Sequence, residues 1–247
     1  MMPFEWYELL LIGVVALFAG FIQRVSGFGL GIFAMIFFPY LMPTYTAATV
    51  SGLLSVGQTS YNAVKYRKRI RFKTVLPLLL AALITIPIAV LFSSYVPKAL
   101  FKIILGAVLI VLSIFFLFLK ERIRIKATIP TGIGSGLVGG VLTGLFSTGG
   151  PPAVLYLSSA IEDKDEFFGS IQFYFALTGI YTAVMRAING AMTIEVLYAF
   201  AIGFVLCFVG NFIGKLVFDK LNSAKIKTII YIFMAISGLI MIIDNLG

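Results

Sequence analysis

Apolar residues fill most of the chain in long runs, which short clusters of charged residues separate. The first run extends from Tyr7 to Met42. As one helix it would be roughly 54 Å long at about 1.5 Å per residue, whereas the hydrocarbon core of a bilayer is only about 30 Å thick. The run is therefore too long for one membrane span and barely long enough for two.

Three glycines at alternate positions interrupt the first run, in the stretch Arg24-Val25-Ser26-Gly27-Phe28-Gly29-Leu30-Gly31. A helix can break at glycine, and the backbone there can approach a ligand closely. We predict two short helices joined at this break, in a hairpin that enters and leaves the membrane by the same face. The run from Ala127 to Ile161 contains a second such stretch, Ser147-Thr148-Gly149-Gly150-Pro151-Pro152. Two broken segments in corresponding places of two halves point to the binding site of a transporter.

Six further apolar segments each have about the length of one membrane span, at 45–64, 75–95, 99–119, 167–188, 194–218 and 228–243. Basic residues gather in three of the loops between them, at 65–73, 120–126 and 215–227. Cytoplasmic loops carry an excess of Lys and Arg. The three loops lie on one side only if each broken run returns to the side from which it entered.

This charge pattern predicts an all-α polytopic membrane protein made of two inverted-topology halves, residues 1–126 and 127–247. Each half would hold one re-entrant hairpin and three transmembrane helices, and this odd number of crossings inverts the second half. We expect a multi-pass protein of the plasma (inner) membrane with both termini outside. Two short sequence matches at nearly the same spacing support the repeat: Ser26 and Gly29 with Ser147 and Gly150, and Tyr61-Asn62-Ala63-Val64 with Tyr181-Thr182-Ala183-Val184.

The amino-acid composition excludes several classes of protein. The chain has 247 residues, and its hydrophobic share of 60% excludes a soluble domain. The chain contains no histidine, which excludes imidazole metal sites and histidine acid–base catalysis. The net charge of +9 lies mostly in short loops, so it reports orientation in the bilayer and not binding to nucleic acid. The carboxylates fall at segment ends or in loops. We therefore expect no catalytic residue, no metal and no cofactor.

The glycine-rich break that precedes an apolar helix ending at Pro39, together with Gly149-Gly150-Pro151-Pro152 in the second half, resembles the TauE/SafE sulfite exporter family. The resemblance covers essentially the whole chain. The resemblance implies a membrane transporter and not an enzyme. It also implies that the cargo is a small sulfur-containing anion such as sulfite, sulfoacetate or another organosulfonate. The first break has fewer glycines here than many members have.

The helix after each break would begin with unpaired N–H groups and the positive end of its dipole, which bind anions without any charged side chain. Arg24 would add charge, and hydroxyls and amides would add donors. The residues predicted to bind the substrate are Arg24, Ser26, Gly27, Gly29, Gly31, Gln58, Ser147, Thr148, Gly149, Gly150 and Gln172. Arg186 lies late in a span, and we interpret it as an anchor at the membrane interface.

Two alternatives remain open at this point. One is a permease for another small solute, such as an organic acid. The other is a membrane enzyme or an assembly factor, which would have no need of paired glycine breaks. The expected partners are a small anion and the lipid bilayer, with no nucleic acid, and the sequence leaves the existence of a homo-oligomer open.

Overall fold

The computed structural model describes residues 4–119, 126–217 and 223–246, and within these ranges it consists of helices and short connections. The all-α prediction is confirmed, and seven of the described helices are long and apolar enough to cross a membrane. The α-helices are α1 (Trp6–Ser26), α2 (Leu30–Leu41), α3 (Thr44–Lys65), α4 (Phe72–Tyr95), α5 (Lys98–Ile114), α6 (Ile129–Phe146), α7 (Gly150–Ala160), α8 (Lys164–Ile188), α9 (Ile194–Val217) and α10 (Ser223–Leu246). A 3-10 turn, η1 (Arg67–Arg69), follows α3, and a π-helical turn, η2 (Phe115–Leu119), follows α5.

The first break separates α1 from α2 at the predicted glycines. Gly27 and Gly29 have φ angles of 80° and 113°, in the region that residues with a Cβ rarely adopt. The two arms differ in length more than we predicted. α1 has 21 residues and is about 31 Å long, close to the thickness of the hydrocarbon core, whereas α2 has only 12. The expectation of two short helices is therefore wrong for the first arm.

The second break separates α6 from α7 in a similar way. α6 has 18 residues and α7 has 11. Ser147 follows the last residue of α6 and has a φ of 57°. Among the described residues other than glycine, it is the one with a left-handed backbone. Prolines then occupy the first turn of α7, where the missing N–H removes no helical hydrogen bond.

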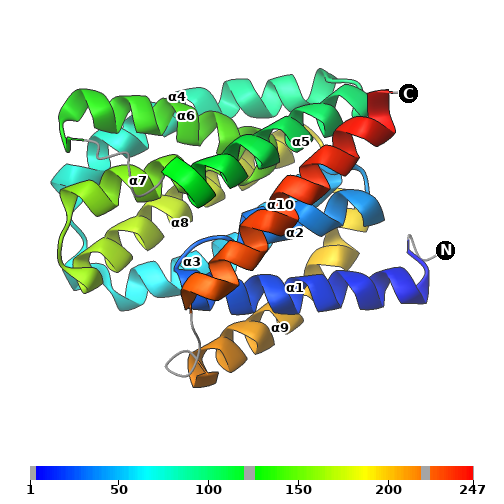
Figure 1. Cartoon of the computed structure of the whole chain (residues 1–247), viewed down its shortest axis with the longest axis horizontal. Coiled ribbons are helices and arrows are strands. Elements are labelled where there is room, and N and C mark those ends of the chain that lie inside the picture. The colour runs from blue at the N-terminus through cyan, green and yellow to red at the C-terminus, as the bar shows by residue number, and fades with distance from the viewer. Residues whose placement is uncertain (1–3, 120–125, 218–222, 247) are drawn as a thin grey trace.

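The helices pack in pairs that join the first five to the last five. The most extensive contacts are α4 with α6, α1 with α9, α5 with α10, and α3 with α8. Figure 1 shows α4 beside α6 along one side and α1 beside α9 along the other, with α5 and α10 running alongside each other. Exchanging α1–α5 with α6–α10 leaves these pairs unchanged, as two equivalent halves would require. The boundary between residues 126 and 127 and the inversion of one half stay predictions.

Glycines allow two of these pairs to touch through their backbones. A Cβ on Gly20 of α1 would lie 2.0 Å from the carbonyl oxygen of Cys207 in α9, and one on Gly210 would lie 1.8 Å from that of Leu17. Gly136 of α6 approaches the carbonyl oxygen of Leu78 in α4 in the same way, at 2.2 Å. Small residues at such contacts let membrane helices approach closely and gain van der Waals packing.

Helix α3 differs from its neighbours in what it buries. It has 22 residues, but its buried face carries hydroxyl and amide groups, and it is not among the seven strongly apolar helices. Buried polar residues in a membrane helix face the interior of the bundle. Together with α8, α3 therefore forms the polar centre around which the apolar helices pack.

The beginning of α1 and the end of α10 lie toward the same end of the molecule in Figure 1. At the opposite end, the basic turn after α3 joins the start of α8. Arg71 forms an ion pair with Glu166 at 2.7 Å, and its backbone N–H donates to the Ser170 hydroxyl at 2.9 Å. Lys220 and residues 120–125, which we also assigned to basic loops, lie outside the described residues.

We expect cysteines that replace Lys68 and Leu246 to be labelled from opposite sides of the membrane. The basic loop at Lys68 should react with an impermeant maleimide only from the cytoplasm, and Leu246 only from outside. The measurement uses intact cells and inverted vesicles, with Cys207 replaced by alanine as the background. Labelling of both positions from one side would contradict the predicted topology.

Candidate functional site

The two helix breaks lie directly against each other. A Cβ on Gly31, at the start of α2, would be 2.1 Å from the carbonyl oxygen of Ser147. A Cβ on Gly150, at the start of α7, would lie 3.5 Å from both the Phe28 and Phe175 rings. The chain thus brings together two stretches that are more than a hundred residues apart, and the glycines leave room for them to do so.

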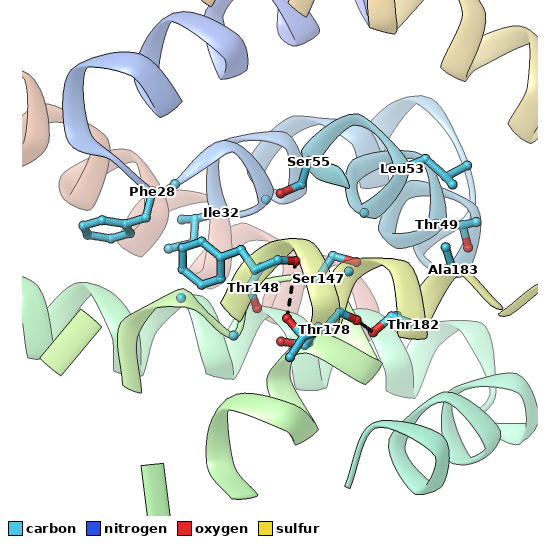
Figure 2. A pocket seen from close by; sticks show the side chains of 18 of the residues that line it. Phe28, Ile32, Thr49, Leu53, Ser55, Ser147, Thr148, Thr178, Thr182 and Ala183 are labelled. Carbon is cyan, nitrogen blue, oxygen red and sulfur yellow. Dashed lines mark hydrogen bonds between the residues drawn. The ribbon is translucent and has the colours of Figure 1, made fainter. Parts of the chain in front are cut away.

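A cavity lies where the two breaks meet α3 and α8. Figure 2 shows Phe28 and Ile32 from the first break, Ser147 and Thr148 from the second, and hydroxyl side chains of α8 around it. The space open to the centres of water-sized spheres is about 50 Å³. None of the described residues that line this cavity is an Asp or a Glu.

Arg186 of α8 provides the positive charge of the cavity. Its side chain is only 1% exposed, and Nη2 donates to the carbonyl oxygens of Gly144 and Leu145 at 3.0 and 3.2 Å. These carbonyls belong to the last turn of α6, where no helical N–H is available to them. The guanidinium also lies 5.7 Å from the centre of the Tyr45 ring. Nε and Nη1 have no hydrogen-bond partner among the described atoms.

Thr148 adds a second unpaired donor. Its hydroxyl is buried, with 2% of the residue exposed, and forms no hydrogen bond with any described group. The other hydroxyls differ in this respect: Thr143, Thr178 and Thr182 donate to carbonyls one turn earlier in their own helices, and Ser147 donates to Ala48 at 2.8 Å. A buried donor without a partner costs roughly 1–3 kcal/mol, so Thr148 favours a ligand that accepts a hydrogen bond.

The amino-terminal end of α2 also faces the cavity. Gln23 accepts a hydrogen bond from the Leu30 backbone N–H at 3.1 Å and so caps one of the free donors of this helix. Gly29, Gly31 and Ile32 line the cavity. The positive end of the α2 dipole therefore adds to the charge of Arg186.

Six of the eleven predicted binding residues line this cavity. They are Gly29, Gly31, Ser147, Thr148, Gly149 and Gly150. The side chain of Ser26 lies outside the described part of the structure. Gly149 approaches its neighbours so closely that a Cβ would be 1.9 Å from the Thr143 hydroxyl.

The other predicted residues lie elsewhere. Gln172 donates to the carbonyl oxygen of Gly27 at 2.8 Å and so supports the first break without lining the cavity. Arg24 and Gln58 line a separate cleft between α1, α3 and α9.

The sequence interpretation of Arg186 is wrong, because the residue is buried and does not anchor the protein at an interface. Its position near the end of α8 suggested an anchor, but side chains on a helix tilt toward the amino-terminal end and can reach back into the bundle. One available signal was that Arg186 is a cation in an apolar segment far from the three basic loops. Gln23 was also missed, since amides in membrane helices commonly serve only to join helices.

Comparison with known proteins places the chain in a family. The family described as Sulfite exporter TauE/SafE matches residues 12–241. The probable sulfite/organosulfonate exporter TauE of Cupriavidus necator is 24% identical over 217 residues, which cover 84% of this chain and 85% of that protein. No solved structure matches. Since the family match spans nearly the whole chain, this protein belongs to the sulfite exporter TauE/SafE family, whose members are membrane transporters and not enzymes.

Proposed function

We propose that this chain exports small sulfur-containing anions, such as sulfite, sulfoacetate or other organosulfonates, across the plasma membrane. The anion binds near the middle of the bilayer, in the cavity where the two glycine-rich breaks meet. The name of the relative from Cupriavidus necator supports this substrate class. The chemistry of the cavity supports it independently.

The observation that carries the proposal is the buried guanidinium of Arg186, which faces the cavity and has no carboxylate partner among the described residues. A buried charge is costly unless another charge compensates it. The two carbonyls of α6 that accept from Arg186 offset only part of this cost, because they are dipoles and not full charges. An oxyanion in the cavity would accept from the free Nε and Nη1 and supply the missing charge.

The size of the cavity favours a compact anion. The space open to the centres of water-sized spheres is only about 50 Å³. A narrow cavity of this kind favours sulfite over a longer organosulfonate such as sulfoacetate.

Thr148→Val is expected to weaken sulfite binding about tenfold or more. Valine keeps the shape of threonine but removes the free hydroxyl, and a hydrogen bond to a charged group is worth about 1.5–3 kcal/mol. Binding is measured by isothermal titration calorimetry on the purified chain, with sulfoacetate and acetate as comparison ligands. Tighter binding of acetate than of sulfite would favour an organic-acid permease.

The matched control is Thr182→Val, because the Thr182 hydroxyl lines the same cavity but already donates to the carbonyl of Thr178 at 2.7 Å. Its loss should leave sulfite affinity nearly unchanged. Equal weakening in both valine variants would mean that the cavity changes shape and that the Thr148 hydroxyl has no specific role.

A further inference from the structure

A second cleft gathers positive charge toward the end of the molecule that carries the basic loops. Arg24 of α1, Lys65 of α3 and Lys215 of α9 line it, together with the amides of Gln58, Asn62 and Asn211. The space open to the centres of water-sized spheres is about 320 Å³, larger than that of the cavity. Arg24 and Gln58, which we predicted at the substrate site, therefore belong to this second space.

The three cations of the cleft have no acidic partner in the described part of the chain, where Arg71 and Glu166 form the ion pair. The Lys65 ammonium lies 5.8 Å from the centre of the Tyr66 ring, a contact that leaves its charge in place. Like charges around one cleft repel each other, and a concave surface of one sign raises the local concentration of the opposite ion. The charge of this cleft thus selects an anion.

The amides form a fixed floor for the cleft. Asn211 donates to Gln58 at 3.1 Å, and Gln58 donates to the backbone carbonyl of Cys207 at 3.1 Å. Gln58 lies seven residues before Lys65 on α3, so the cleft reaches about 10 Å into the bundle from the level of Lys65. This floor is polar, and the Gln58 and Asn62 side chains in it are buried.

The same floor connects to the first helix break. Asn62 donates to Gln172 at 3.4 Å, and Gln172 donates to the carbonyl of Gly27 at 2.8 Å. Gln23 and Arg24 are adjacent in sequence, and yet Gln23 lines the cavity and Arg24 lines the cleft. The last turn of α1 and the Gly27 break therefore form the wall between the two spaces.

We propose that this cleft is a second oxyanion site, which takes up the transported anion at the end with the basic loops before it reaches the cavity. The inference rests on the proposed function, because it assigns the same sulfite or sulfonate to both spaces. The phosphate of an anionic lipid has similar oxyanion chemistry, so the test must distinguish the two sources.

The test counts sulfite equivalents bound to the full chain in nanodiscs of phosphatidylcholine at low ionic strength. The wild type should bind two equivalents by titration calorimetry. The triple variant Arg24→Gln, Lys65→Gln, Lys215→Gln should lose one of them. A control triple variant, Lys68→Gln, Lys73→Gln, Lys98→Gln, removes the same charge outside the cleft and should keep both. Thr148→Val should weaken the other equivalent and leave the cleft equivalent unchanged.

The inference is overturned if the cleft triple variant keeps both equivalents, or if the control variant loses one as well. If the wild type binds one equivalent that only Thr148→Val weakens, the proposed function stands and the second site does not. If Thr148→Val has no effect but the cleft variant loses an equivalent, the second site stands and the cavity assignment fails. Phosphatidylglycerol retained by the wild type but not by the cleft variant, with no second sulfite equivalent, would assign the cleft to lipid.

Discussion

Arg186→Met is expected to lower sulfite affinity about 100-fold or more and to stop transport at concentrations that saturate the wild type. Methionine fills much of the volume of arginine but removes the buried charge. Two donors of the guanidinium, Nε and Nη1, have no partner among the described atoms. Charge-assisted hydrogen bonds are worth about 1.5–3 kcal/mol each, and two of them correspond to at least about two orders of magnitude in affinity.

The measurement is sulfite binding by calorimetry, together with efflux of labelled sulfite from proteoliposomes. Arg186 also holds two carbonyls of α6, so the thermal unfolding midpoint of each variant is needed. Arg186→Lys keeps the charge without the planar group and should retain part of the affinity. Lys98→Gln removes an exposed charge that does not line the cavity, and it should leave affinity and efflux unchanged. Wild-type affinity in a folded Arg186→Met protein would show that the guanidinium does not bind the anion.

Gly31→Ala is expected to abolish transport, although alanine is the best helix former and Gly31 lies in the first turn of α2. The new Cβ would be 2.1 Å from the carbonyl oxygen of Ser147, a backbone atom that cannot rotate away. The two breaks would have to move apart, and this distorts the cavity between them. Overpacking of this kind costs about 1–3 kcal/mol of stability.

Gly134→Ala is the matched control, because nothing lies within 4 Å of the Cβ position of Gly134 in α6. This variant should transport normally and unfold at the same or a slightly higher temperature. Efflux from proteoliposomes and thermal unfolding test both variants. Normal efflux in Gly31→Ala would mean that the contact between the breaks is not needed for the transport cycle.

The positions of the breaks could be predicted because their cause is local. Gly27 and Gly29 take backbone angles that residues with a Cβ rarely adopt, and this preference is written in the residue type itself. The apolar spans were predictable for the same reason, because a segment of about 20 apolar residues matches the thickness of the bilayer. The fold class and the family therefore followed from short stretches of sequence.

The assignment of side chains to the cavity was less predictable, because it depends on which way a helix face turns. Arg24 lies three residues before Gly27, and we predicted it as the cation of the substrate site, but it lines the second cleft. Arg186, far from either break in the sequence, is the cation that reaches the cavity. The packing of α8 against α3 and against the end of α6 decides this, and no local pattern reports that packing. The role of the six cavity residues in binding an anion stays a prediction.

Cys207 is the single cysteine of the chain, and it is buried between Gln58 and the close contact of α9 with Gly20. Sulfite is a nucleophile that cleaves disulfides, converting one sulfur to an S-sulfonate and releasing the other as a thiol. A chain with one shielded thiol has no internal disulfide to offer this reagent. Sulfite, the substrate that we propose, therefore has no internal disulfide to cleave in this chain.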